Sequence, residues 1–420
     1  QDSMIKRFIV IVAVFFTVVA TAQENVSSPY SYYGIGLNTF KGTVENRSMG
    51  GLSMFSDSIH LNLRNPAGYG RLRRTTYAVG GSHERLSLNS DAGEDNAKVS
   101  SLDYLAIGVP IGGNLGFGIG VLPYTSVGYQ ILDIRESVAS RLEGRGGMNK
   151  VFLSAGYQVL PSLSIGVDAN YNFGNLQNQR TLIREEVQLG SRDVSRTDLL
   201  GFSYNFGVDF QEKLKNGLNL HAAATYSPTT NIDAENSRQL ATIAFSGSGG
   251  ETVVEERDLN VPDSELTLPA KYTIGLGLGR SNKWFFGGEY VSTDDNSFLS
   301  VSGAGGGNAN FENAAQYKFG GYFIPQYNSI TNYFNRIVYR AGFRYEETGL
   351  SINSQDINEF GITFGVGLPV GPGFSNINLG FEYGQRGTTD SSLIQEDYFR
   401  FSVGLSLTEA RRWFERRKFN

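Results

Sequence analysis

Alternation of side-chain type is the feature that most restricts how this chain can fold. In residues 202–210, FSYNFGVDF, every even position is aromatic or aliphatic, and every odd position is Ser, Asn, Gly or Asp. Successive side chains of a β-strand point to opposite faces, so such a segment forms a strand with one wholly apolar face. The same alternation recurs in residues 163–173, 218–226, 337–345, 377–383 and 399–407. An all-β fold is therefore predicted.

The residues on the polar faces distinguish two all-β classes. A soluble sandwich would show Lys, Glu and Thr to water, whereas these faces carry mostly Gly, Ser, Asn and Asp, which suit a crowded barrel interior. Strands of about 9 to 12 residues can cross a bilayer when tilted, and only a closed sheet satisfies its backbone in lipid. We predict a transmembrane antiparallel up-and-down β-barrel of roughly fourteen strands over residues 73–408. A soluble β-protein is the alternative.

Composition excludes several kinds of site. The chain has no cysteine, which rules out disulfides and thiolate metal sites, and its three histidines lie far apart in sequence. A net charge of −5 argues against a nucleic-acid partner, which would favour a basic face. The stretch GLGLGRS (275–281) looks like a phosphate loop but lies on an alternating strand. No Ser-His-Asp arrangement is visible, so we expect neither an enzyme nor a cofactor.

The N-terminus has the features of a secretory signal peptide. Lys6 and Arg7 precede the apolar run at residues 8–19, and Ala20-Thr21-Ala22 forms a small-residue cleavage site. A membrane anchor is the alternative, but the run is too short for a spanning helix. We expect residues 1–22 to be removed and the mature chain to be exported to the outer membrane.

The connections between alternating segments differ in length. Short ones at 159–164, 279–284 and 368–375 are expected at the periplasmic rim, and long irregular ones at 176–197, 229–265, 294–313 and 325–334 outside the cell. The acidic 229–265 connection is either a solvated loop or a site for divalent cations that bridge lipopolysaccharide phosphates. After the last strand, residues 409–420 form either an amphipathic basic tail at the inner rim or a disordered tail.

Residues 23–72 do not alternate and read as turns and short helices. Gly50-Gly51 marks one turn, and Asn65-Pro66-Ala67 marks a corner just before the first long strand. Pro fixes φ and cannot donate to a β-ladder. About fifty such residues ahead of a barrel fit inside its lumen as a plug. The alternative for the corner is a simple turn into strand one.

Here the sequence resembles a known family. YGIG (33–36), RSMGGLSM (47–54) and DSIHLNLRNPAGYG (57–70) resemble the N-terminal hatch of FadL/TodX-type outer-membrane transporters. Residues 118–129, 144–174, 268–279 and the WFERRK tail look like segments of Bacteroidota-type relatives. The resemblance implies a fourteen-stranded barrel, a hatch in the lumen, uptake of long-chain fatty acids or other hydrophobic compounds, and sideways exit into the membrane. It also implies a hatch role for Asn65, Pro66, Ala67, Gly50 and Gly51.

Two further expectations stay open. The charged residues Arg336, Arg340, Arg344, Glu346 and Glu382 either line a pore as a ladder or pair with one another and with the hatch. The whole protein is either a transporter or an accessory subunit of a Bacteroidota outer-membrane secretion or barrel-assembly machine. The expected partners are outer-membrane lipid and lipopolysaccharide, a hydrophobic small molecule, and other outer-membrane proteins.

Overall fold

The structure is a computed structural model that describes residues 27–245, 250–294, 309–370 and 375–409. The predicted signal peptide and nearly all of the predicted basic tail lie outside these residues. Within them, no helix is both long and apolar enough to cross a membrane.

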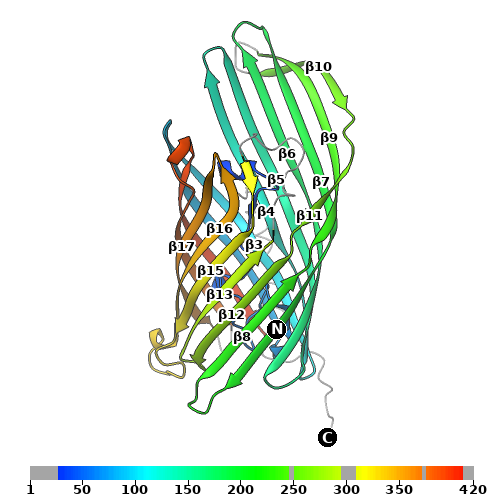
Figure 1. The fold of residues 1–420 in the computed structure, drawn as a ribbon. Helices are drawn as coiled ribbons and strands as arrows, with labels where there is room; N and C mark the ends of the chain where they lie inside the picture. Colours follow the sequence, from blue (N-terminus) through cyan, green and yellow to red (C-terminus); the bar gives the residue numbers. More distant parts are fainter. Residues whose placement is uncertain (1–26, 246–249, 295–308, 371–374, 410–420) are drawn as a thin grey trace, which may run out of the picture.

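The chain forms one closed antiparallel sheet (Figure 1). The sheet closes because β2 pairs with both β3 and β19. Nineteen strands are described, and some are pieces of one span, so the described residues make fourteen spans, as predicted. The spans are β2 (Thr76–Ser90), β3 (Gly93–Ile111), β4 (Leu115–Arg135), β5 (Val138–Gln158), β6 (Leu163–Arg184), β7 (Leu189–Lys213), β8 with β9 (Asn219–Ser227, Thr230–Phe245), β10 with β11 and β12 (Glu251–Leu259, Ser264–Leu268, Lys271–Arg280), β13 (Trp284–Thr293), β14 with β15 (Ala309–Phe311, Ala314–Phe323), β16 (Val338–Ile352), β17 (Gln355–Val370), β18 (Ser375–Arg386) and β19 (Gln395–Thr408).

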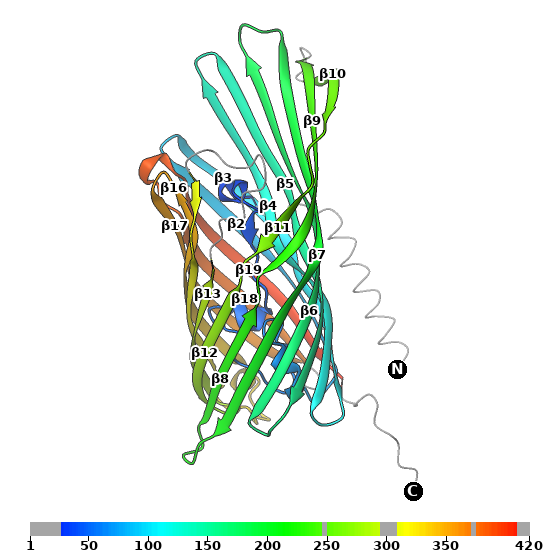
Figure 2. The same ribbon diagram turned by 45° about the vertical axis from the view of Figure 1, so that its right-hand side comes forward.

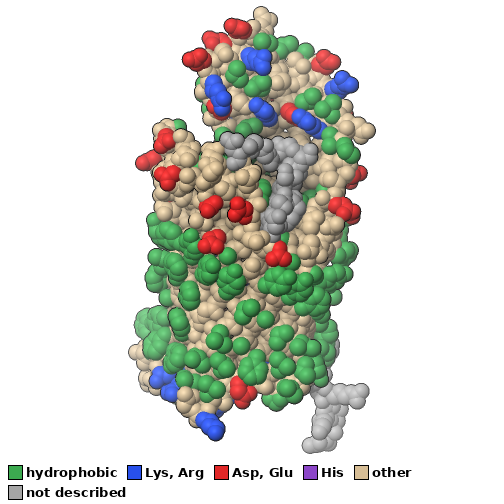
Figure 3. Space-filling model, viewed as in Figure 1, with side chains coloured by type: hydrophobic (Ala, Val, Ile, Leu, Met, Phe, Trp, Pro, Cys, Tyr) green, Lys and Arg blue, Asp and Glu red, His purple; other side chains and the backbone are tan. Residues whose placement is uncertain are grey.

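The alternation predicted from the sequence fixes which face looks outward. On β7, Phe202 is 58% exposed and Phe206 is 48% exposed, whereas Asp209 is fully buried. On the face shown in Figure 3, exposed apolar side chains form a band across the lower part of the molecule, with most charged side chains above it and a few below. An apolar belt of this kind is what a barrel presents to lipid.

Several neighbouring spans continue well beyond the others. β5, β6 and β7 have 21, 22 and 25 residues, against 10 for β12 and β13. They rise with β9 and β10 as a tall extension on one side of the barrel (Figure 2). The prediction of irregular loops at 176–197 and 229–265 is therefore wrong. These residues form strands by pairing with neighbours distant in sequence, and they lack the sustained alternation that marks a strand in the sequence.

The connection at 325–334 lies at the opposite end from the one predicted. Because the strands are antiparallel, the connection from β15 to β16 shares an end with the short turn from β12 to β13. This is the periplasmic end if the short turns lie there. Length and polarity suggested an external loop, but Ile324 and Ser329 are buried, so the segment folds back onto the barrel.

Residues 27–75 pack against the polar faces of the strands, and in Figure 2 the strands surround them. This segment contains η1 (Pro29–Tyr32), β1 (Leu37–Asn38), α2 (Val44–Arg47) and η2 (Pro66–Arg71). Thr43 caps α2 by accepting the N–H of Asn46. Two short 3-10 turns lie elsewhere, η4 (Phe334–Arg336) and η5 (Asp390–Ser392).

Candidate functional site

The Asn65-Pro66-Ala67 corner joins the N-terminal segment to the wall. Asn65 is fully buried and caps η2, because its Oδ1 accepts the Ala67 N–H at 3.1 Å. Its Nδ2 donates to the Val208 carbonyl on β7 at 3.1 Å. Pro66 opens η2, where its missing N–H costs no hydrogen bond. The corner is thus a 3-10 helix that binds the wall rather than a bare turn into β2.

A row of glycines on the wall makes room for this corner. Gly166 faces Pro66 so closely that a Cβ on Gly166 would lie 2.3 Å from the Pro66 carbonyl carbon. A Cβ on Gly116 would lie 2.1 Å from the Tyr69 oxygen. Register places four glycines side by side on β4, β5, β6 and β7: Gly116, Gly156, Gly166 and Gly207. The backbone of η2 therefore contacts the backbone of the wall directly.

A second glycine row receives Gly50. A Cβ on Gly320 of β15 would lie 2.3 Å from the Met49 oxygen, and one on Gly342 of β16 would lie 2.1 Å from the Gly50 nitrogen. Gly50 and Gly51 both have positive φ, +69° and +82°, which disfavours any other residue. Sequence reasoning singled out this pair, but only the strand register identifies the wall glycines opposite it.

A network of ion pairs occupies the barrel on the side of β16 to β19. Arg344 Nε lies 2.8 Å from Glu382 Oε1, and Arg344 also pairs with Glu346 and Glu359. Arg386 joins Glu359 to Glu396, and Ser28 of the N-terminal segment donates to Glu396. Three of the predicted charged residues thus meet. Sequence reasoning missed Glu359, Arg386, Glu396 and Arg400, although each lies on the polar face of its alternating strand.

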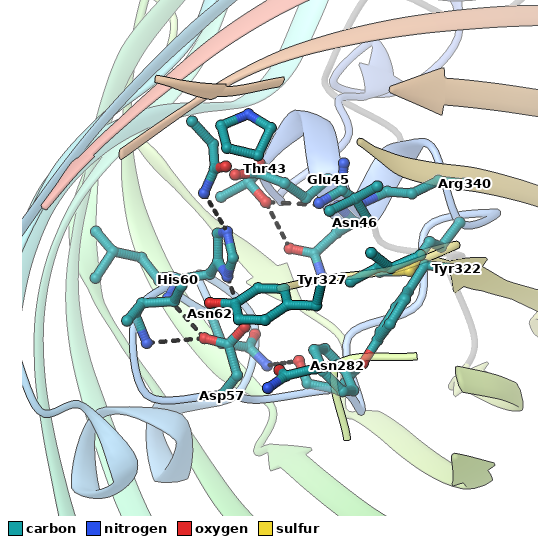
Figure 4. Close-up of a pocket in the computed structure, with 18 of the residues that line it drawn as sticks. Thr43, Glu45, Asn46, Asp57, His60, Asn62, Asn282, Tyr322, Tyr327 and Arg340 are labelled. Atoms are coloured by element: carbon teal, nitrogen blue, oxygen red, sulfur yellow. Dashed lines mark hydrogen bonds and ion pairs between the residues drawn. The ribbon is translucent and has the colours of Figure 1, made fainter. Parts of the chain in front are cut away.

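Arg336 and Arg340 lie apart from this network, beside a cavity at the end that carries the short turns (Figure 4). The cavity has a volume of about 150 Å³ and lies between the N-terminal segment and β16, β18 and the 324–336 connection. Arg340 Nη1 donates to Asn378 Oδ1 at 3.1 Å, and Asn378 donates in turn to Glu45. The predicted five-residue ladder is therefore two separate arrangements.

His60 and Asp57 form an ion pair on the wall of this cavity. His60 Nδ1 lies 2.6 Å from Asp57 Oδ2. Burial alone would lower the pKa of His60, but the Asp57 carboxylate outweighs it, and the pKa of His60 is raised. Burial alone would raise the pKa of Asp57, but His60 and two backbone N–H groups hold it below its usual value. The pair keeps about a quarter of its side-chain surface exposed, 24% for His60 and 27% for Asp57.

Three lysines on or facing the N-terminal segment lack a carboxylate partner. Lys41 Nζ lies 3.7 Å from the centroid of the Tyr124 ring. Burial, and after it the ammonium groups of Lys271 and Lys150, hold the pKa of Lys41 well below its usual range. Among the ion pairs of the described residues, none includes Lys41, Lys150 or Lys271. By contrast, Lys318 pairs with Glu289 at 3.2 Å.

The wall is split between β3 and β4. The two strands pair only from Leu105–Val121 to Ile111–Leu115. Beyond this, β3 stays paired with β2 and β4 with β5, and no pair between β3 and β4 occurs in the described residues. Pro123 stands at the split, next to a register shift. There β1 takes the free edge of β4, with Asn38 opposite Thr125.

An apolar cluster lies beside the split, on the inner side of the extension. It joins Ile35 of the N-terminal segment to side chains of β4, β5, β6, β7, β9 and β11, and Tyr124 packs against it. Its other buried members are Val127, Tyr129, Met148, Leu176, Leu199, Ile232, Ala234, Leu266 and Leu268. The described residues contain no group of three or more His, Asp or Glu side chains that could hold a metal ion.

Comparison with known proteins identifies the family. A model of the BamG family matches residues 4–420. The chain belongs to the BamG family. No curated protein matches this BamG-family chain in sequence.

Several solved structures share its fold. The CymD monoaromatic hydrocarbon channel has a TM-score of 0.59 at 15% identity, over 90% of this chain and 100% of its own. The Pseudomonas putida toluene transporter TodX has a TM-score of 0.58 at 16% identity, over 89% and 100%. A Pseudomonas aeruginosa FadL homologue has a TM-score of 0.56 at 12% identity, over 89% and 99%. The predicted FadL-type barrel fold is thus confirmed.

Proposed function

We propose that this chain is an outer-membrane transporter for hydrophobic small molecules, with residues 27–75 as a hatch inside the barrel. The observation that carries the proposal is the split between β3 and β4, where β1 of the hatch replaces a barrel neighbour. A barrel that serves only as an anchor gains nothing from such a split, because unpaired backbone in the wall costs free energy. The shared fold with channels for toluene and monoaromatic hydrocarbons supports the same proposal.

The side chains near the split suggest the class of substrate. The apolar cluster on the extension ends at Tyr124, and the Lys41 ammonium group lies over the ring of that tyrosine. Lys150 and Lys271 lie near Lys41, and neither takes part in an ion pair within the described part of the chain. An apolar surface beside cationic groups suits a molecule with one acidic head group and an apolar tail, such as a long-chain fatty acid. Such a molecule would leave between β3 and β4 directly into the hydrocarbon of the membrane.

The hatch has a firmly held part and a weakly held part. Residues 44–72 contact the wall through the two glycine rows and through the buried pair of Arg71 with Asp209. The β1 strand is only two residues long and pairs with β4 alone. We therefore propose that the Asn65-Pro66-Ala67 corner is the fixed anchor and that residues 37–41 move to open the split, while Ser28, Tyr30 and Ile35 stay buried.

A disulfide lock tests this movement, because the natural chain has no cysteine. Asn38 and Thr125 are Cα partners on β1 and β4, and antiparallel partners lie about 4.5–5.5 Å apart, within the span of a disulfide. The double variant Asn38→Cys/Thr125→Cys should lose uptake of a fluorescent long-chain fatty acid when oxidised and regain it after reduction. The matched control is Ala78→Cys/Ser406→Cys, which joins the neighbouring strands β2 and β19.

The control lock should leave uptake unchanged in both redox states. Equal uptake by the oxidised and reduced Asn38–Thr125 lock, with the disulfide shown by mass spectrometry, would overturn gating by β1. Absence of uptake in every form would overturn the transport proposal itself.

A second candidate is an accessory subunit of an outer-membrane secretion or barrel-assembly machine. The extension favours it, because β10 is exposed along nearly its whole length and pairs only with β9 among the described strands. Such an edge can accept a strand from another protein. Native gel electrophoresis of the purified protein tests this candidate. A heteromeric complex that is lost when residues 239–258 are replaced by a short turn would support it, and a lone barrel in both cases would contradict it.

A further inference from the structure

The cavity beside Arg340 is lined by two arginines that contact no carboxylate directly in the described residues. Arg340 is 8% exposed, and its guanidinium group donates a hydrogen bond to the neutral amide of Asn378. Arg336 stacks over Tyr333, with its guanidinium carbon 5.2 Å from the ring centroid, and its buried Nε has no hydrogen-bond partner in the described residues. Neither arginine takes part in an ion pair of the described residues. A buried donor left unpaired is unfavourable, and a ligand oxygen would satisfy it.

The two carboxylates on the cavity wall are occupied by other groups. Asp57 is paired with His60, and Glu45 is linked to Arg340 only through the amide of Asn378. When His60 is protonated, three positive groups (Arg336, Arg340 and His60) face two carboxylates, and a single negative charge restores neutrality. A guanidinium group presents parallel donors that match the oxygens of a carboxylate or phosphate group.

The volume of the cavity and its other lining residues limit the size of a ligand that can bind there. The cavity volume of about 150 Å³ corresponds to a few water molecules, so a small molecule fits and a chain segment does not. Tyr322 and Tyr327 face the cavity opposite His60 (Figure 4), and Phe55 also lines it. These rings suit a compact apolar or aromatic body attached to the anionic group.

We propose that this cavity is a binding site for a small monoanion, whose carboxylate or phosphate oxygens contact Arg336 and Arg340. The site opens at the end of the barrel with the short turns, away from the β3–β4 split and from the apolar cluster. It is therefore separate from the proposed transport route, and it does not depend on transport. It adds a ligand from the periplasmic side to a protein whose other contacts are with lipid and the cell exterior.

The full-length barrel purified in detergent provides the test. 4-Fluorobenzoate is titrated with the protein and followed by fluorine NMR, and inorganic phosphate is titrated separately and followed by phosphorus NMR. Saturable binding of 4-fluorobenzoate and none of 4-fluorobenzamide, its neutral counterpart, is the expected result. Binding of phosphate alone would identify a phosphate group rather than a carboxylate as the ligand chemistry. No saturable binding of either anion would overturn the proposal.

Variants connect the binding to this cavity. Arg336→Gln should weaken binding by about tenfold or more, since a charge-assisted hydrogen bond contributes about 1.5–3 kcal/mol. Arg336→Lys, which keeps the charge, should lose less. Arg280→Gln removes an exposed arginine at the same end that does not line the cavity, and it should bind as the natural protein does. Equal weakening by Arg280→Gln and Arg336→Gln would show adsorption to a basic rim and would overturn the site.

Discussion

The glycine row under the corner leads to the sharpest prediction. In Gly166→Ala, the new Cβ would lie 2.3 Å from the Pro66 carbonyl carbon and 2.4 Å from the Ala67 nitrogen. Both atoms belong to backbone and cannot rotate away, so η2 must move outward by about 1 Å to reach a normal contact. That shift breaks the 3.1 Å hydrogen bond from Asn65 to Val208 and leaves a buried amide unpaired.

The magnitude follows from these two losses. Overpacking costs about 1–3 kcal/mol, and the unpaired buried donor costs roughly a further 1–3 kcal/mol. The docked state of the hatch should therefore lose about 2–6 kcal/mol relative to the undocked state. The lower figure already raises the undocked fraction by about thirtyfold.

Trypsin measures that fraction directly. Arg47 and Arg71 are both 8% exposed in the docked hatch, so cleavage after them requires undocking. When undocking is fast relative to cleavage, the cleavage rate follows the undocked population. Gly166→Ala should be cut at these sites about thirtyfold faster than the natural protein, with the barrel itself intact on heat-modified gels.

Gly113→Ala is the matched control. It adds the same methyl group in the turn between β3 and β4, where nothing lies within 4 Å of the new Cβ, and Gly113 does not have a positive φ. Its cleavage rate should equal that of the natural protein. Equal rates for Gly166→Ala, Gly113→Ala and the natural protein would refute the argument that bare backbone on the wall holds the corner.

Three further outcomes are expected. Arg344→Met removes one of the two arginines that contact each of Glu359 and Glu382, and it should lower the free energy of unfolding in detergent by about 1.5–3 kcal/mol, measured by urea titration. The pKa of His60 is raised, so its ion pair with Asp57 stabilises the hatch fully below about pH 6.5, and this stabilisation is lost as the pH rises through the raised value. Trypsin cleavage of the hatch should therefore become faster over that pH range. His60→Gln should remove this pH dependence. Lys150→Gln/Lys271→Gln should reduce uptake of a fatty acid by about tenfold but leave uptake of the corresponding alcohol unchanged, in a cell-based assay.

The barrel was predictable because its signal is local. A strand between lipid and a polar lumen must alternate at every second residue, and residues 202–210 show this without knowledge of any partner strand. The extension was not predictable, because its strands lack this local signal. Residues 176–197 leave the membrane, so neither face has to be apolar, and their strand state depends on pairing with neighbours distant in sequence.

The candidate site was predictable only at residues whose role follows from their own local backbone conformation. Gly50-Gly51 and Asn65-Pro66-Ala67 could be recognised as turns because their backbone requirements are local. The glycines that receive them could not, since 52 glycines are spread over the chain and only strand register selects those facing the hatch. Arg336 and Arg344 likewise share a charge but lie in different surroundings, because the chain leaves the β-strand at the η4 turn.

The two glycine rows and the β3–β4 split together explain how one segment can both close a barrel and move. Backbone packed directly on backbone leaves no side chains to rearrange, so residues 44–72 have no alternative arrangement at small cost. Residues 37–41 bind differently, through the two-residue strand β1 and hydrogen bonds such as that from Thr39 to the Pro123 carbonyl at 2.7 Å. In the proposed mechanism, motion is confined to these residues, and opening the split does not require release of residues 44–72.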